Sequence, residues 1–341
     1  MSILKSLSKP SHSDLFSHLY IEQSVLDEPL TKEIRAKFSR SKVIIIKHYK
    51  DVFNRPNQDF AVQSRSKNLI LARREAPFLY EGSYYSDGFE YENFFYTPSI
   101  LGCLYDCEYC YLSGMYNSAN SVFFVNTADF FDALTPYLDK PTLIAISYDT
   151  DTLAIESITS HTKAWIEHAQ MNPNLHLEIR TKSANFKAIR SLTCNEQIVL
   201  AWTLSPQKII DTYEHRTPSL DSRLKSIKEA VEAGWKVRVC IDPVIYNEEF
   251  HELYLPLIDK LFSTIEPDKL FQLTLGSFRM SSTHLKRIKK LRRSDIAFYP
   301  YDVKEGIVSY GKKIEQEILH VMTQKALEYI PKTRIRTWQL Q

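Results

Sequence analysis

After about residue 97 the chain alternates short apolar, β-branched runs with longer segments of helical periodicity. The predicted strands are residues 142–148, 175–181, 197–204, 236–241 and 270–275. The predicted helices between them are residues 152–170, 185–192, 220–233 and 252–265. Gly234 directly follows the third of these helices, where glycine commonly ends a helix. Alternating strands and helices predict a parallel sheet whose strands are joined by crossover helices.

This pattern predicts an α/β fold, a partial (β/α)6 barrel of the TIM type, over residues 97–280. Residues 1–96 are predicted to be an N-terminal extension packed on the barrel, with a helix near 30–39 and a strand at 43–46. Residues 281–341 are predicted to form a helical C-terminal segment that closes one side. In such barrels the chemistry lies at the carboxyl ends of the strands.

The composition is that of an ordinary soluble protein: 341 residues, of which 44% are hydrophobic and 25% are charged. Its 43 basic and 41 acidic residues give a net charge of +2, which excludes a general nucleic-acid-binding footprint. One basic run, residues 286–293, has two interpretations, a local basic patch or a solvated helix face.

The sequence predicts a cytoplasmic protein without a membrane partner. Residues 1–12 lack the apolar core of a signal peptide, and no apolar stretch is long enough to span a bilayer. The chain has five cysteines, which is too few for the disulfide framework of a secreted protein. Three of them fall within eight residues, and this clustering requires an explanation.

Cys103, Cys107 and Cys110 form a C-x3-C-x2-C motif that follows Gly102 and a predicted strand. Thiolates are the usual ligands of a [4Fe–4S] cluster, and three of them leave one iron without a protein ligand. A structural zinc site is the main alternative, but zinc takes a fourth Cys or His, and the loop contains neither. The motif therefore favours a cluster with one open iron.

This spacing resembles that of the radical S-adenosylmethionine (SAM) superfamily, and the whole chain resembles spore photoproduct lyase and its relatives. The residues that carry the second resemblance are Cys107-Glu108-Tyr109-Cys110-Tyr111-Leu112, Arg180-Thr181-Lys182, Glu214-His215-Arg216-Thr217-Pro218 with Arg223, Phe278-Arg279, and Tyr310-Gly311-Lys312. The resemblance implies an enzyme in which SAM binds the open iron and is cleaved reductively to a 5′-deoxyadenosyl radical. It also implies an electron donor such as flavodoxin or ferredoxin, and damaged DNA as a candidate partner.

The resemblance also assigns candidate site residues. Lys182 would pair with the SAM carboxylate as a point charge, and Thr150 and Thr203 fall where the family contacts SAM through hydroxyl groups. Asp242 falls near the family's adenosine contact, where its carboxylate would bind ribose hydroxyls or cap the next turn. Tyr109 and Tyr111 match tyrosines thought to relay a hydrogen atom, and their rings would also cover the cluster.

The chain departs from the family at Tyr148, which stands where spore photoproduct lyase has the cysteine that returns a hydrogen atom to the repaired thymine. Tyr148 is retained as a catalytic candidate because a tyrosine can also relay a hydrogen atom. Cys240 either substitutes for that cysteine or is a small buried strand residue. The DNA-gripping C-terminal hairpin also looks shortened around Tyr310, which has no arginine beside it.

Three functions remain open at this point. The first is a lesion-repairing enzyme like spore photoproduct lyase. The second is a radical SAM enzyme that acts on a peptide or a metabolite, which the substitution at Tyr148 favours. The third is a non-catalytic iron–sulfur or redox-sensing protein, against which the retained Lys182, Tyr109 and Tyr111 argue.

Overall fold

The computed structural model describes residues 15–82 and 91–338. The prediction about a targeting segment at residues 1–12 therefore lies outside the described residues. Within them, no helix combines the length and apolar character needed to cross a membrane.

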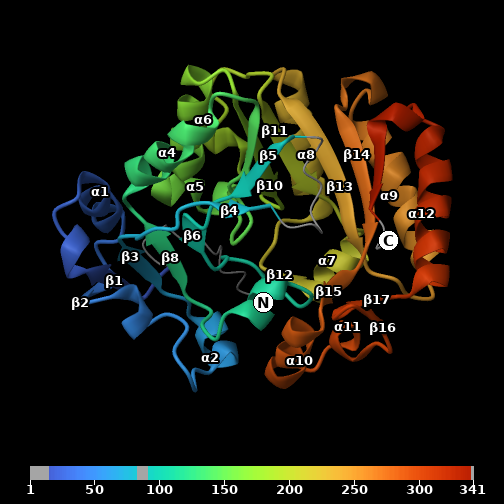
Figure 1. Cartoon of the computed structure of the whole chain (residues 1–341). Coiled ribbons are helices and arrows are strands. Elements are labelled where there is room, and N and C mark those ends of the chain that lie inside the picture. The colour runs from blue at the N-terminus through green and yellow to red at the C-terminus, as the bar shows by residue number, and fades with distance from the viewer. Residues whose placement is uncertain (1–14, 83–90, 339–341) are drawn as a thin grey trace, which may run out of the picture.

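An eight-stranded sheet forms the centre of the protein (Figure 1). Its strands, in their order across the sheet, are β4 (Tyr80–Glu81), β5 (Asn93–Tyr96), β9 (Thr142–Ala145), β10 (Leu175–Thr181), β11 (Ile198–Thr203), β13 (Lys236–Val244), β14 (Gln272–Ser277) and β18 (Ile335–Trp338). The strands from β5 to β18 are all parallel, whereas β4 pairs antiparallel with β5. In the described part of the chain the edge strands β4 and β18 do not pair with each other. The sheet is thus an open, partial barrel, as predicted.

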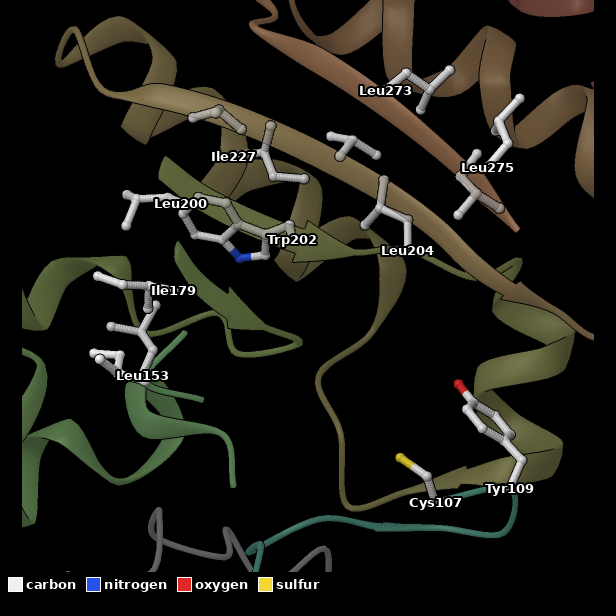
Figure 2. Packing of buried hydrophobic residues seen from close by; sticks show 14 of the residues in the cluster. Cys107, Tyr109, Leu153, Ile179, Leu200, Trp202, Leu204, Ile227, Leu273 and Leu275 are labelled. Atoms are coloured by element: carbon white, nitrogen blue, oxygen red, sulfur yellow. The ribbon is translucent and has the colours of Figure 1, made fainter. Parts of the chain in front are cut away.

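Helices cover the outer side of this sheet (Figure 1). They are α4 (Thr127–Leu134), α5 (Thr152–Thr159), α6 (His161–Met171), α8 (Leu220–Glu232), α9 (Phe250–Thr264) and α12 (Lys312–Leu327). Alternate strand side chains pack beneath them, and Figure 2 shows Leu200 and Trp202 of β11 near Ile227 of α8. On the other face, Arg238 of β13 donates to Gln272 Oε1 at 2.9 Å and pairs with Glu178. The period-two alternation thus separates an apolar outer layer from a polar barrel interior.

All five strands predicted in the barrel are confirmed, but two of the predicted helices differ. The helix predicted at 152–170 is broken at Ser160, where a left-handed φ of 51° separates α5 from α6. The helix predicted at 185–192 is only the 3-10 turn Phe186–Ala188, because so short a segment gains little from helix propagation while its Phe186 and Ile189 are drawn into the core. Gly234 has a φ of 84° and ends α8 as expected.

A second sheet joins the N-terminal segment to the barrel segment. Its strand order is β2 (Lys42–Ile46), β1 (His18–Glu22), β3 (Leu69–Ala72), β8 (Ser121–Phe124) and β6 (Ile100–Leu101), with α1 (Pro29–Lys37) and α2 (Phe60–Arg65) beside it. β8 and β6 lie beyond residue 97, so this sheet contains strands from both predicted segments. A deletion of the N-terminal segment would therefore remove β3, one of the two strands that pair with β8.

The C-terminal segment contains helices α10 (Ser282–Leu291), α11 (Asp295–Phe298) and α12, and also strands that the sequence pattern did not predict. β15 (Arg279–Ser281), β17 (Ile307–Ser309) and β16 (Asp302–Lys304) form a small antiparallel sheet, and β18 extends the main sheet. Strands of three or four residues are too short to produce a recognisable hydrophobic alternation.

Candidate active site

The three cysteines of the motif lie in one loop between β5 and α3 (Tyr111–Met115), at the carboxyl end of the first parallel strand. Within this loop β7 (Asp106–Cys107) pairs antiparallel with β12 (Glu214–His215), which follows α7 (Gln207–Tyr213). The Glu108 amide also donates to the Tyr213 carbonyl at 2.9 Å. Figure 2 shows the Cys107 and Tyr109 side chains rising from this segment toward the strands. The loop is thus fixed by a segment about a hundred residues away.

Lys67 holds the first half of the loop. Its ammonium group donates to the backbone carbonyls of Cys103 at 2.6 Å, Leu104 at 3.2 Å and Tyr105 at 2.8 Å. Burial lowers the pKa of Lys67, while the nearby Cys103 and Asp106 act in the opposite direction. All three ammonium protons are therefore matched by carbonyl groups of a loop that forms no regular structure there.

Glu214 is the centre of a buried charge network beside the loop. It pairs with Arg223 at 2.5 Å and lies 3.5 Å from the ammonium group of Lys182. Ser205 donates to Glu214 at 2.8 Å, and the Tyr109 hydroxyl donates to the same carboxylate. Burial acts to raise the pKa of Glu214, but Lys182 and Arg223 outweigh it and lower the pKa to about 2. The carboxylate is therefore ionised throughout the neutral range.

Lys182 extends from the end of β10 into this network. Its ammonium group donates to the Tyr109 hydroxyl at 2.9 Å and lies 4.8 Å from the ring centroid. Burial acts to lower the pKa of Lys182, but the Glu214 carboxylate raises it above its usual value. Lys182 thus remains charged at the carboxyl end of the strand, adjoining the motif tyrosine.

The three thiols occupy an environment suited to a cluster. Burial raises the pKa of Cys103 to about 12 and also raises the pKa values of Cys107 and Cys110, while Lys67 or Lys182 acts to lower each of them. Among the described residues, no three Cys, His, Asp or Glu side chains are placed to hold a single metal ion. A cubane distributes its thiolates over three irons, and Lys67 and Lys182 would balance the charge of those thiolates. The donor set and its cations therefore fit an iron–sulfur cluster.

A series of tyrosine rings lies on the other side of the loop. The Tyr111 hydroxyl donates to the backbone carbonyl of Tyr148, which follows β9. The Tyr148 ring stacks on Tyr96 of β5, with 4.6 Å between centroids and 23° between planes. Tyr96 stacks in turn on Tyr80 at 5.4 Å. Tyr148 is thus built into an aromatic wall that connects to the motif through Tyr111.

The remaining predicted SAM contacts are more dispersed. Asp242 of β13 accepts from Arg279 at 2.8 and 3.3 Å and lies 3.7 Å from Arg180. The Arg279 guanidinium in turn lies 4.1 Å above the Trp338 ring. The Asp242 carboxylate is therefore engaged by arginines rather than capping a turn, and Arg279 and Arg180 lower its pKa against the effect of burial.

Thr203 is buried at the end of β11, where its backbone carbonyl accepts from Arg223 at 3.2 Å. Thr150 is half-buried between β9 and α5. Cys240 is fully buried, and Arg180 donates to its sulfur at 3.3 Å, so it occupies an interior position on the strand. The structure thus brings together the cysteine loop, Lys182 and Tyr109, while Asp242 belongs to a separate arginine network.

A family model described as "Spore photoproduct lyase" matches residues 15–336 of this chain. That match covers nearly the whole chain. The chain belongs to the spore photoproduct lyase family, a family of radical SAM enzymes.

Individual relatives of this family are distant from the chain in sequence. The spore photoproduct lyase of Clostridium acetobutylicum is 23% identical over 289 residues, which cover 82% of this chain and 83% of the relative. That of Bacillus subtilis is 24% identical over 75% of each chain. A solved spore photoproduct lyase complexed with dinucleoside spore photoproduct superposes with a TM-score of 0.83 at 20% identity, covering 96% of this chain and 100% of that chain. A variant with bound AdoMet and the same dinucleoside superposes with a TM-score of 0.80 at 19% identity.

Three residues of this site have roles that the sequence alone does not reveal. Glu214 and Arg223 belong to a stretch that resembles the family, and Lys67 has no sequence signal. Lys67 precedes β3 within an ordinary polar run, where lysine is normally a surface residue. The stretch around Glu214 resembles the family and so indicates that this part of the sequence matters, but it does not indicate which residues the Glu214 side chain contacts.

We expect Lys67→Met to weaken the cysteine loop. The substitution leaves three partly buried carbonyls without this donor, which costs about 1–3 kcal/mol of unfolding free energy. Iron bound per chain after reconstitution should fall below that of the unmodified protein, as measured by iron analysis and visible absorption. The matched control is Lys225→Met on the exposed face of α8, which should change neither quantity. Full iron content together with unchanged stability in Lys67→Met would show that the loop does not depend on this lysine.

Proposed function

We propose that Cys103, Cys107 and Cys110 hold a [4Fe–4S] cluster and that SAM binds beside it, near Lys182. The observation that carries this proposal is the meeting of three thiols, one buried and two half-buried, with Lys182 and Tyr109 at the carboxyl ends of the barrel strands. When bound, the cluster and SAM supply a 5′-deoxyadenosyl radical that abstracts a hydrogen atom from the substrate.

The chain's own residues position these groups. Lys182 offers a fixed positive charge to the SAM carboxylate, and Glu214 holds that charge in place at 3.5 Å. Arg223 keeps Glu214 ionised from the other side, so the orientation of Lys182 does not depend on solvent. Thr150, Thr203 and Asp242 are proposed as further SAM contacts, with Asp242 presented by Arg279.

For the substrate, we propose a thymine lesion of the spore photoproduct type in damaged DNA. Support comes from relatives named for this reaction and from a structural neighbour complexed with the dinucleoside lesion. An enzyme that acts on a lesion in a duplex takes the damaged nucleotides out of the base stack. Tyr109 and Tyr111 would relay the hydrogen atom, and Tyr148 would stand at the donor position.

A specific observation favours a second candidate, the same cofactors acting on a peptide or a metabolite. Tyr148 replaces the family's donor cysteine, and its ring lies against Tyr96 rather than leaving the space that a small thiol would leave. A thiol also transfers a hydrogen atom to a carbon-centred radical faster than a phenol does, so Tyr148 is a poorer donor than the cysteine it replaces. The filled space would disfavour binding of a bulky dinucleoside lesion, and the poorer hydrogen donor would disfavour its repair.

The Tyr148→Cys variant distinguishes the two substrates. If the lesion is the substrate, this variant should convert dinucleoside spore photoproduct to thymidine products about tenfold faster than the unmodified enzyme, because a thiol lowers the barrier of the final hydrogen transfer. Product formation is measured by chromatography under anaerobic conditions with SAM and dithionite.

The control is Tyr148→Ser, which opens the same space without an S–H bond and should not gain this activity. If every variant cleaves SAM but none converts the dinucleoside, the lesion is not the substrate, and the second candidate is favoured.

A further inference from the structure

The surface beside the cysteine loop carries a compact group of cations, which we call the α10 face. It comprises Lys286, Lys289 and Lys290 on α10, Arg293 just beyond it, and Phe298 on α11. All five side chains are exposed. The net charge of the whole chain is only +2, so this concentration of charge is local.

These cations differ from those on the other helices. Lys225 and Lys228 of α8 each lie within ion-pair distance of a glutamate one turn away, and Lys163 of α6 does the same. Within residues 15–82 and 91–338, none of the four cations of the α10 face forms an ion pair. Their charge therefore projects into solvent, unlike that of an ordinary solvated helix face.

The α10 face is firmly connected to the cysteine loop. Arg292 pairs with Asp106 of the loop at 2.7 Å. Arg287 donates to the carbonyls of Gly114 and Met115 in α3, at 3.3 and 3.2 Å. A Cβ atom at Gly114 would come within 2.6 Å of the His284 carbonyl oxygen, so α3 and α10 pack backbone to backbone. Figure 1 shows α10 at the same end of the molecule as β12, the strand paired with the loop.

The acidic side chains of the loop contact residues outside the α10 face. Asp106 pairs with Arg292, and Glu108 lies 2.7 Å from the His215 ring nitrogen. An exposed aromatic ring completes the surface: Phe298 is 56% exposed and lies beneath the Lys289 ammonium group, 5.5 Å from the ring centroid. Cations around an accessible ring form the usual chemistry of a small, electrostatically steered docking site.

We propose that the α10 face docks an acidic one-electron carrier protein. This inference rests on the proposed function, because only a cluster in the adjoining loop requires an external electron there. In the encounter the carrier loses one electron and the cluster gains one, and no bond is made or broken. Short-lived redox complexes bury little area and depend on charge complementarity, which matches a group of cations confined to one helix and its flank.

The limits of the patch favour a small protein over a nucleic acid. Exposed acidic residues lie on the elements next to α10, namely Asp295 on α11 and Asp302 and Glu305 in and beside β16, whose partner strand β17 contacts α10. A surface that follows a phosphate backbone presents a continuous cationic stripe, and these carboxylates interrupt such a stripe within one helix length.

The test compares Lys289→Gln/Lys290→Gln with the matched control Lys225→Gln/Lys228→Gln. The probe is flavodoxin, an acidic flavoprotein, and its affinity is measured by titration of the flavin fluorescence. We expect the dissociation constant to rise about tenfold in the α10 variant and to stay within about twofold in the control. The rate of cluster reduction by reduced flavodoxin should fall in parallel, whereas reduction by dithionite should not change.

An unchanged flavodoxin affinity in the α10 variant would overturn the inference. If the α10 variant loses affinity for a duplex oligonucleotide but keeps its affinity for flavodoxin, the inference is overturned and the α10 face binds nucleic acid instead. Failure of the proposed function is distinguishable, because it appears as a lack of SAM cleavage with dithionite in every variant. The binding titration does not depend on that result.

Discussion

Glu214→Ala is expected to lower the free energy of unfolding by about 3–5 kcal/mol, the usual cost of breaking a buried ion pair. Glu214 and Arg223 are both inaccessible to solvent, so the substitution leaves the guanidinium buried without its counter-ion. It also removes the acceptor of Ser205 and Tyr109 and the charge that faces Lys182. The change is measured by urea denaturation of the protein.

The matched control is Glu249→Ala, which removes a half-exposed glutamate paired with Lys208 on the surface. Such pairs contribute about 0–1 kcal/mol, so the free energy of unfolding of this variant should remain close to that of the unmodified protein. The free energy of unfolding of Glu214→Gln should lie between those of the two alanine variants, because the amide still accepts hydrogen bonds but carries no charge. Equal stability of the Glu214→Ala and Glu249→Ala variants would mean that the buried network does not hold the site together.

Cys107→Ala is expected to abolish binding of the cluster. Cys107 is buried in β7, where backbone pairing with β12 leaves the loop little freedom to offer a substitute ligand. A cubane that has lost one of three protein thiolates is left with two irons that have no protein ligand. Iron and acid-labile sulfide per chain should fall to the level of a protein that was never reconstituted, and the broad visible absorption should disappear.

Two cysteines of the same chain serve as controls. Cys194 is exposed and Cys240 is buried in β13, and neither lies in the loop. Cys194→Ala and Cys240→Ala should both retain iron and sulfide. Iron retained by the Cys107→Ala variant would contradict the cluster assignment. Zinc in place of iron in the unmodified protein would contradict it as well.

The elements that could be predicted from the sequence are those with a local signal. Leu175–Thr181 and Lys236–Val244 show strong strand patterns, and Cys103, Cys107 and Cys110 carry a spacing that few other sites share. The 3-10 turn Phe186–Ala188 and the short strand β18 were missed because tertiary packing, rather than local periodicity, determines their conformation.

The supporting residues of the site could not be predicted because their roles arise from contacts between distant segments. Tyr109 and Glu214 are 105 residues apart, and Lys67 lies 36 residues before Cys103. Nothing local distinguishes a buried, ionised Glu214 from a surface glutamate. The family resemblance located the stretch around Glu214, but only the folded structure shows that its carboxylate contacts Tyr109, Lys182 and Arg223.

The most direct test of the account is whether the reconstituted protein makes 5′-deoxyadenosine from SAM. The protein is purified without oxygen, loaded with iron and sulfide, and incubated with SAM and dithionite, and the products are separated by chromatography. We expect 5′-deoxyadenosine from the unmodified protein and only background from Cys107→Ala. A fully loaded, unmodified protein that forms no 5′-deoxyadenosine would contradict the proposed function.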